Sequence, residues 1–207
     1  MKILAIGAHP DDIEFGAGGT LFKLARKNCR IDFLVMSKGG IGGRARERWL
    51  EQKSSARILK ASLHYGGFQD THINMNRKLI QTVERTIGKL KPDIIMTNYF
   101  NDTHQDHRNL AKAVETAARY MKNLIFFEVP TTMEFLPSLF VDIGDVMNEK
   151  VGLLKCHKSQ IYKTRVADLS IIESARSTAI YRGYQDRIKY AEAFVPQRLS
   201  LDFLLSL

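Results

Sequence analysis

The sequence predicts a Rossmann-like, doubly wound α/β fold with a mostly parallel sheet. Short, continuous apolar runs alternate with segments whose apolar residues recur at helical spacing, and this alternation occurs four times. Each strand-helix-strand unit of this kind connects parallel strands by a right-handed crossover. The chain has 207 residues, of which 44% are hydrophobic, and it shows no internal repeat or low-complexity tract. We therefore expect one domain over residues 1–207.

The first 60 residues contain two predicted strands and two predicted helices. They are expected at 2–7 (strand), 16–27 (helix), 31–36 (strand) and 44–60 (helix). A glycine-rich loop, Ser-Lys-Gly-Gly-Ile-Gly-Gly, covers residues 37–43 after the second strand. The helix that follows is highly charged, and it turns Trp49, Ala56 and Leu59 inward.

The pattern continues to Pro130 and then weakens. A helix is expected to end before Pro92. Its apolar face is expected to contain Ile73, Ile80, Val83, Ile87 and Leu90. A strand at 93–99, a helix at 105–121 and a strand at 124–129 follow. Beyond Pro130 we expect a helix around Met147–Leu154, a second helix at 169–181 and an apolar run at 190–195. No linker separates them, so they belong to the same domain.

Charge and cysteine content limit the classes of protein. Lysine and arginine number 31 against 22 acidic residues, for a net charge of +9, but acidic residues interrupt the basic ones throughout. This pattern predicts a solvated basic surface that favours anionic substrates, and no nucleic-acid partner. No stretch approaches the roughly 20 apolar residues of a membrane span. The apolar start is too short for a signal peptide, and Cys29 and Cys156 form no disulfide framework, so we expect a cytoplasmic protein.

Two clusters of histidine and aspartate are the candidate functional residues. Ala-His-Pro-Asp-Asp, residues 8–12, directly follows the first predicted strand, and Thr-His-Gln-Asp-His, residues 103–107, follows the strand at 93–99. Open α/β sheets place their ligand sites at the carboxyl ends of strands, so both clusters are expected at the same edge. Either cluster alone is as easily a turn or a solvated helix pair. Together they predict one metal site.

The residue types indicate a hydrolytic zinc centre. Catalytic zinc commonly takes three ligands from histidine and carboxylate and keeps one position for water, and His9, Asp12 and His107 supply that set. Such a metal lowers the pKa of its water and polarises a carbonyl. Asp11 is expected to stay off the metal and to act as general base.

The remaining residues of the second cluster have two interpretations. His104 precedes His107 by three residues, which places both on one helical face, so His104 would stabilise the oxyanion or protonate the leaving amine. Asp106 would hydrogen-bond a histidine ring nitrogen and fix its tautomer. Alternatively, Thr103 and Asp106 have the spacing of a capping box, in which case Asp106 only caps the helix. His64, His72 and His157 lack a paired cluster and are expected to be structural.

These motifs resemble those of the PIG-L and LmbE-like family of zinc-dependent N-acetylglucosaminyl deacetylases, from Ile3 to about Phe194. The family motif Ala/Pro-His-Pro-Asp-Asp matches residues 8–12, which implies His9 and Asp12 as zinc ligands and Asp11 as base. The family motif His-Pro-Asp-His matches residues 104–107, which implies His107 as third ligand and His104 as an aid to the transition state. Gln105 stands where the family has proline, a difference confined to local loop geometry.

Weaker matches imply substrate contacts. Arg48 and Glu51 resemble the family's Arg-x-x-Glu, whose arginine contacts substrate, and residues 67–70 resemble a segment whose aspartate, here Asp70, binds sugar hydroxyls. The less favoured alternatives are that Arg48 forms an ion pair on the helix surface and that Asp70 forms an Asx-turn before Thr71. His-Lys-Ser-Gln at 157–160, Arg-Gly at 182–183 and the run at 190–194 resemble late family motifs and indicate membership rather than roles.

The expected function is removal of acetyl from an N-acetylated amino sugar or its glycoconjugate, with zinc or another divalent metal as cofactor. An amidase for another amide-linked glycoconjugate is the alternative. A non-haem iron enzyme uses the same ligand types but generally sits on a β-rich scaffold. A nucleotide-binding module is disfavoured because Gly-Ala-Gly-Gly at 16–19 misses the dinucleotide-binding spacing. The sugar conjugate, the acyl group, the physiological metal and homo-oligomerisation are left open.

Overall fold

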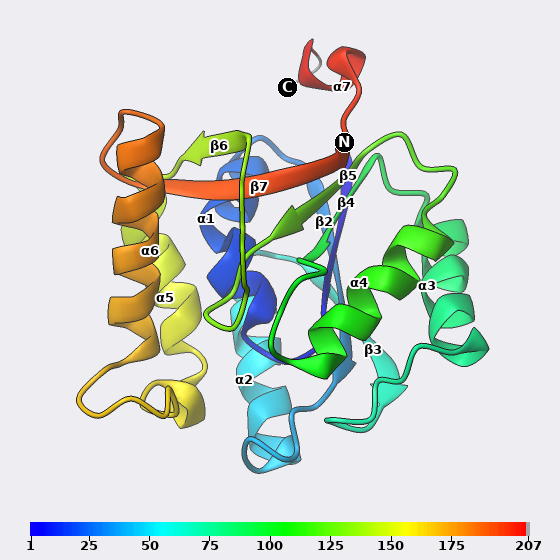
Figure 1. Cartoon of the computed structure of the whole chain (residues 1–207), viewed down its shortest axis with the longest axis horizontal. Coiled ribbons are helices and arrows are strands. Elements are labelled where there is room, and N and C mark those ends of the chain that lie inside the picture. Colours follow the sequence, from blue (N-terminus) through cyan, green and yellow to red (C-terminus); the bar gives the residue numbers. More distant parts are fainter. Residues whose placement is uncertain (206–207) are drawn as a thin grey trace.

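The sheet at the centre of the structure has seven strands in the order β3-β2-β1-β4-β5-β7-β6. The structure is a computed structural model that describes residues 1–205, with side chains described through Phe203 (Figure 1). Neighbouring strands from β3 to β5 are parallel, whereas β7 runs antiparallel to both β5 and β6. The strands are β1 (Lys2–Gly7), β2 (Arg30–Ser37), β3 (Ser62–Phe68), β4 (Ile94–Asn98), β5 (Leu124–Phe127), β6 (Leu139–Asp142) and β7 (Ala191–Arg198). The predicted α/β class with a mostly parallel sheet is confirmed.

Helices cover both faces of this sheet. They are α1 (Asp12–Arg26), α2 (Ala45–Ile58), α3 (Arg77–Leu90), α4 (Gln105–Ala117), α5 (Met147–Lys155), α6 (Ile171–Gln185) and α7 (Leu201–Leu205). Helices α3 and α4 pack on one face, around Leu79, Val83 and Val114. Helices α1, α2, α5 and α6 lie on the other side, where Leu21, Ala56 and other buried residues form a second core (Figure 1). No helix in the described part of the chain is long and apolar enough to cross a membrane.

Two strands and several helix boundaries differ from the sequence-based expectation. Strand β3 was missed because it lies at an edge of the sheet and all of its residues but Phe68 are exposed or only partly buried, so it lacks a continuous apolar run. Strand β6, at the other edge, is only four residues long. Helix α1 begins at Asp12 rather than at Gly16, so the glycines lie inside the helix. Ile73 is buried but precedes α3, so it does not share that helix's face.

A glycine inside α1 marks a close approach between helix and sheet. A Cβ atom on Gly16 would overlap the ring of Phe127, whereas a Cβ atom on Gly88, in α3, would meet no atom within 4 Å. We expect Gly16→Ala to destabilise the protein by about 1–3 kcal/mol through overpacking. Gly88→Ala is expected to stabilise it by about 0.5–1 kcal/mol, because alanine is the better helix former. Urea unfolding of both variants checks this packing, and equal stabilities would contradict it.

Candidate metal centre and active site

The two predicted clusters meet between β1 and β4, which are neighbours at the centre of the sheet. His9 lies two residues beyond β1, and His107 lies in the first turn of α4, directly after the loop that leaves β4. The chain leaves β1 towards one face of the sheet, through α1, and leaves β4 towards the other face, through α4 (Figure 1). Such a reversal opens a crevice at the carboxyl ends of the strands, where α/β proteins bind ligands.

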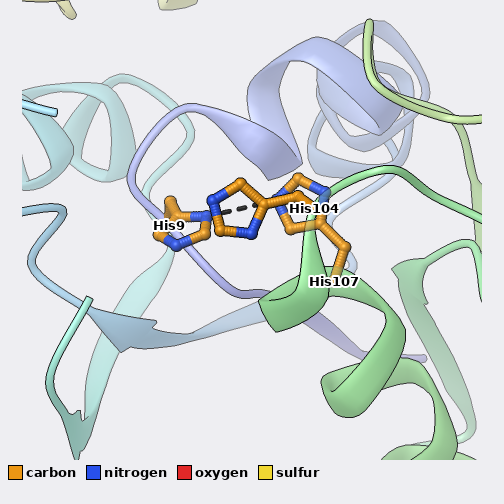
Figure 2. A group of neighbouring side chains, drawn as sticks. All are labelled: His9, His104 and His107. Atoms are coloured by element: carbon orange, nitrogen blue, oxygen red, sulfur yellow. Dashed lines mark hydrogen bonds between the residues drawn. The ribbon is translucent and has the colours of Figure 1, made fainter. Parts of the chain in front are cut away.

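The three predicted ligand atoms form a compact triangle. His9 Nδ1 lies 3.1 Å from His107 Nε2, which is 3.3 Å from Asp12 Oδ2. The third side, from His9 Nδ1 to Asp12 Oδ2, is 3.7 Å. Ligands of a tetrahedral zinc ion at 2.0–2.1 Å are separated by roughly 3.3 Å. The triangle therefore fits one metal ion, and Figure 2 shows His9 and His107 joined at these ring nitrogens.

Backbone and amide groups hold the carboxylate ligand in place. Asp12 Oδ2 accepts hydrogen bonds from the His9 backbone N–H at 3.0 Å and from Asn98 Nδ2 at 3.3 Å. Asn98, the last residue of β4, also accepts a hydrogen bond from the Ala8 N–H at 3.2 Å. Sequence reasoning missed Asn98, although its place at the end of β4 was a usable signal.

Carboxylates lie close to the remaining ring nitrogens of both predicted histidine ligands. Asp102 Oδ2 lies 3.2 Å from His107 Nδ1. On the other ring, His9 Nε2 is 3.0 Å from Asp70 Oδ1 and 3.1 Å from Asp106 Oδ2. Metal-binding histidines usually donate their second N–H to such a carboxylate, which fixes the tautomer and the orientation of the ring. Asp102 was not predicted as a site residue, although it stands only two residues before His104.

The same carboxylates make the site attractive to a cation. Burial opposes a charge on His9, but hydrogen bonds to Asp106 and Asp70 outweigh it and raise the pKa of His9 to about 9. For His107, burial is outweighed by Asp12 and Asp102, which raise its pKa to about 10. Burial also opposes the charge on Asp12, but the two histidines hold its pKa below the usual range. Positive charge at the centre of the triangle is therefore strongly favoured.

Two other groups of possible ligands overlap this triangle. One is His9, His104 and His107, and the other is His9, Asp70, His104 and Asp106; within each, the ligand atoms lie within 4.8 Å of one another. The carboxylates of the second group already accept hydrogen bonds from the backbone. Asp106 accepts hydrogen bonds from the N–H groups of Thr71 and Ile73 at 2.8 and 3.2 Å. Asp70 accepts one from the Ile41 N–H at 2.8 Å. We interpret the two aspartates as supports of the His9 ring rather than as ligands.

His104 caps α4 and presents a donor to the site. Its Nδ1 accepts a hydrogen bond from the Asp106 N–H at 3.2 Å, and its ring stacks on His107 at 4.8 Å. The N-cap of α4 is therefore His104, and Thr103 and Asp106 do not form the capping box that their spacing allowed. Burial and the charge of His9 lower the pKa of His104. A neutral ring whose Nδ1 accepts must carry its proton on Nε2.

Asp11 stands beside the ligand triangle in an unusual backbone conformation. Its φ of 91° is left-handed, and it precedes the first turn of α1. Its carboxylate lies 3.4 Å from Arg48 Nη2, and its backbone N–H donates to Gln52 Oε1 at 3.3 Å. Burial raises the pKa of Asp11 to about 6, against the opposing charges of Arg48 and His157. A carboxylate with this pKa is suited to accept a proton near neutral pH.

A buried polar cluster behind Asp11 was not predicted. Glu14 Oε1 accepts hydrogen bonds from Gln52 Nε2, at 2.6 Å, and from the Ser55 hydroxyl. His157 Nε2 lies 3.5 Å from the same oxygen. Gln52 and Ser55 follow Arg48 by four and seven residues, so a helical face of α2 was the signal available for them. The cluster connects α2 to the backbone of Asp11.

Arg48 and Asp70 line the cavity but also brace its loops. Arg48 is 5% exposed and donates to the carbonyl oxygens of Gly39 and Pro10, each at 2.9 Å. It therefore joins the glycine-rich loop to the loop of His9. Asp70 is 6% exposed and bonds to that glycine-rich loop and to His9. Both residues face a cavity of about 730 Å³ that also contains the ligand triangle. Their predicted contact with substrate stays a prediction.

The orientation of His107 provides a test of the site. Asp102 also accepts the His104 N–H at 2.8 Å, so an isosteric amide is the least disruptive change. We expect Asp102→Asn to weaken metal binding by about 10- to 100-fold, because the His107 ring loses its carboxylate partner. Competition with a chromophoric chelator measures the affinity. Asp93→Asn, at a surface hydrogen bond with Lys2, is the matched control and should bind metal normally. Equal affinities for both variants would contradict the assigned role of Asp102.

At the switch point of this doubly wound sheet lie two histidines and one carboxylate, with a further carboxylate and a neutral histidine beside them. These are the residue types of a hydrolase-type metal centre. Residues 4–118 match the PIG-L family, described as GlcNAc-PI de-N-acetylase. The chain belongs to this family.

Two relatives extend the similarity beyond that region. The uncharacterized deacetylase YaiS of Escherichia coli K12 is 34% identical over 169 residues, which cover 76% of this chain and 90% of that protein. The diacetylchitobiose deacetylase of Thermococcus kodakarensis is 30% identical over 224 aligned positions, which cover 94% of this chain and 83% of the relative. Both relatives are therefore deacetylases by name, and the similarity to the second spans nearly the whole chain.

Solved structures share the fold at lower identity. The conserved protein TT1542 from Thermus thermophilus superposes with a TM-score of 0.86 at 23% identity, over 96% of each chain. The diacetylchitobiose deacetylase from Pyrococcus horikoshii gives 0.81 at 23% identity, over 95% of this chain and 83% of its own. GalB, a 4-carboxy-2-hydroxymuconate hydratase from Pseudomonas putida, gives 0.82 at 19% identity over 97% of each chain. These likenesses show the fold, which hosts more than one reaction.

Proposed function

We propose that this protein is a zinc-dependent deacetylase that hydrolyses the acetamide of an N-acetylated amino sugar or its small glycoconjugate. The observation that carries the proposal is the triangle of His9, Asp12 and His107, with Asp11 and His104 lining the same cavity. The deacetylase relatives support this chemistry, and one of them is named for diacetylchitobiose. The proposal places the protein in the cytoplasm, consistent with its two free cysteines.

Asp11 is the base for the water that attacks the acetamide carbonyl. When bound, zinc lowers the pKa of a water molecule and polarises the amide carbonyl. Asp11 takes the proton from that water, and its raised pKa of about 6 matches a base that must also release the proton later. Arg48 holds the Asp11 carboxylate, and Gln52 holds its backbone, so the base keeps its orientation during the reaction.

His104 and Asp11 complete the reaction. The Nε2–H of His104 donates a hydrogen bond to the oxyanion that forms at the carbonyl carbon. A neutral imidazole is a poor acid, so the proton that reaches the leaving nitrogen is the one that Asp11 accepted from water. The C–N bond then breaks to give the free amine and acetic acid, which loses its proton to solvent and becomes acetate. We therefore assign oxyanion stabilisation to His104 rather than protonation of the amine.

Removal and return of the metal test the proposed function. Dialysis against a chelator should abolish acetate release from N-acetylglucosamine conjugates, because the water loses its activating cation. One equivalent of zinc per chain should restore it, and cobalt and iron(II) in parallel reactions identify other competent metals. Mass spectrometry of the released acid separates a deacetylase from an amidase for a longer acyl group. Undiminished activity after complete metal removal would contradict the proposal, as would a metal-loaded protein that releases no acid from any conjugate.

A further inference from the structure

His157 is buried at the point where three helices meet. It follows the end of α5, and the start of α1 and one side of α2 lie at the same end of the molecule (Figure 1). Its exposed fraction is 1%, and its Nε2 lies 3.5 Å from Oε1 of Glu14, a fully buried residue of α1. Neither His157 nor Glu14 lines the catalytic cavity. Any effect of this pair on the reaction must therefore pass through other residues.

Hydrogen bonds fix the backbone around His157. The His157 N–H donates to the Leu154 carbonyl at 3.0 Å, and the His157 carbonyl accepts the Gln160 N–H at 2.9 Å. Two residues further on, the N–H and the hydroxyl of Ser159 each donate to Glu51, on α2, at 2.7 Å. The His157 ring therefore enters the interior from a segment that is attached to both α5 and α2.

The contact between His157 and Glu14 is an ion pair. Burial opposes a charge on His157, but the carboxylate of Glu14 outweighs it and raises the pKa of His157. The ring nitrogens of His157 make no hydrogen bond within the described part of the chain, so the ring is placed by this ion pair. Ion pairs in protein interiors add little to stability, because the loss of hydration offsets the attraction of the charges. We therefore looked for an effect of the pair on the position of its neighbours.

Glu14 connects His157 to Gln52. The oxygen that faces His157, Glu14 Oε1, also accepts hydrogen bonds from Gln52 Nε2, at 2.6 Å, and from the Ser55 hydroxyl. A carboxylate only accepts, so the amide nitrogen of Gln52 must face Glu14 and the amide oxygen must point away from it. That oxygen accepts the Asp11 N–H at 3.3 Å. A rotated Gln52 amide would present a second donor to Asp11 and break this contact.

Asp11 depends on contacts of this kind. Its φ of 91° is left-handed, a conformation that costs a non-glycine residue free energy and persists only where the surroundings hold it. Two residues of α2 hold the turn, because Gln52 accepts the Asp11 N–H and Arg48 donates to the preceding Pro10 carbonyl at 2.9 Å. The direction of the Asp11 carboxylate beside the ligand triangle therefore depends on the position of Gln52.

We propose that His157 is a positioning residue for Asp11, and that it acts by holding Glu14 and Gln52 in the arrangement that fixes the Asp11 peptide. The inference rests on the proposed function, because the position of Asp11 affects the rate only where Asp11 is the base. A base displaced from the attacking water slows the reaction, while the metal and the substrate still bind. His157 should therefore affect kcat rather than KM.

Two amide substitutions test the proposal with little change in chemistry. The amide nitrogen of glutamine can occupy the place of His157 Nε2, whereas the shorter asparagine does not reach Glu14. We expect His157→Asn to lower kcat for acetate release by about tenfold, with KM and zinc content nearly unchanged, and His157→Gln to recover most of the loss. His64→Ala, at the edge of the sheet, is the control and should have normal kcat. Normal kcat in folded His157→Asn protein overturns the proposal, as do equal losses in both amide variants or a loss that follows the loss of zinc.

A double variant tests whether His157 acts through Gln52. Residues that act through one another have effects that do not add. The protein with both His157→Asn and Gln52→Ala should therefore have a kcat close to that of the slower single variant. A kcat reduced by the product of the two separate losses would show that His157 acts independently of Gln52, which contradicts the proposed route.

The NMR signal of the Asp11 amide separates this inference from the proposed function, because it requires no turnover. In nitrogen-15-labelled zinc protein, Gln52→Ala and His157→Asn should shift this signal in the same direction, and His157→Gln should leave it in place. A signal that His157→Asn does not move overturns the positioning role, even if the protein is an active deacetylase. Zinc protein that shows these shifts but releases no acetate from any conjugate overturns the deacetylase and leaves the attachment of Asp11 to His157 standing.

Discussion

Replacement of His107 by alanine is expected to remove the metal and the activity together. His107 supplies one corner of the ligand triangle, and its loss leaves His9 and Asp12, which are too few to hold a catalytic zinc ion. It also leaves the buried Asp102 carboxylate without its histidine partner and removes one of the two histidines that face Asp12, which further disrupts the site. Metal content, measured by mass spectrometry, should fall from one ion per chain to below about a tenth of that value, with acetate release at background.

His64 offers a matched control for this variant. It pairs with Asp32 at 2.8 Å, at the outer edge of the sheet, so His64→Ala removes a histidine-aspartate pair of the same chemistry far from the cavity. This variant should keep its metal and its activity. Thermal unfolding of both variants shows whether each is folded. A folded His107→Ala protein that retains a full equivalent of zinc would show that the ligand set is wrong.

Replacement of Asp11 by asparagine is expected to abolish catalysis but not metal binding. Asparagine has the same shape and tolerates the left-handed backbone that Asp11 adopts, so the fold should be preserved. It cannot accept a proton from water, and loss of a general base typically costs about 10²- to 10⁴-fold in rate. We expect a fall of that size in kcat, with KM and zinc content nearly unchanged. Steady-state kinetics and metal analysis of the same preparation measure all three quantities.

Two outcomes would contradict the role of Asp11. A folded Asp11→Asn protein with normal kcat would show that another group takes the proton. Loss of zinc from this variant would instead place Asp11 among the ligands, because asparagine is a poorer ligand than aspartate for a hard cation. Gln52→Ala adds a finer test, since it removes the contacts with the Asp11 backbone and with Glu14 but leaves the Asp11 carboxylate in place. It should lower kcat by less than Asp11→Asn does.

The central part of the fold was predictable because its strands are buried on both faces. β1, β2, β4 and β5 are nearly fully buried and therefore appear as continuous apolar runs. The edge strands β3 and β6 are partly exposed, so the same criterion missed them. The start of α1 was predicted four residues too late, because residues 12–15 were assigned to the segment of the first cluster and not to the first turn of the helix. The presence of Gly16 inside the helix is explained by its close approach to Phe127, which lies more than 100 residues away.

The site was predictable where a residue of metal-ligand type directly follows a strand that the sequence reveals. His9, Asp12 and His107 follow recognisable strands, and the structure brings them together, while their function as ligands is still to be measured. Asp102, Asn98 and Gln52 were missed because their importance comes from tertiary contacts with those residues. Arg48 and Asp70 were expected to contact substrate. The structure adds a role for both in bracing the loops around His9, which local sequence does not reveal.

Anomalous diffraction at the zinc edge, from crystals of the zinc-loaded protein, tests the central claim most directly. We expect one strong anomalous peak per chain, within coordination distance of His9 Nδ1, Asp12 Oδ2 and His107 Nε2. The overlapping group of His9, Asp70, His104 and Asp106 is the alternative position. A peak at that group, or no peak between the two histidine ligands, would contradict the metal centre on which the proposed deacetylase rests.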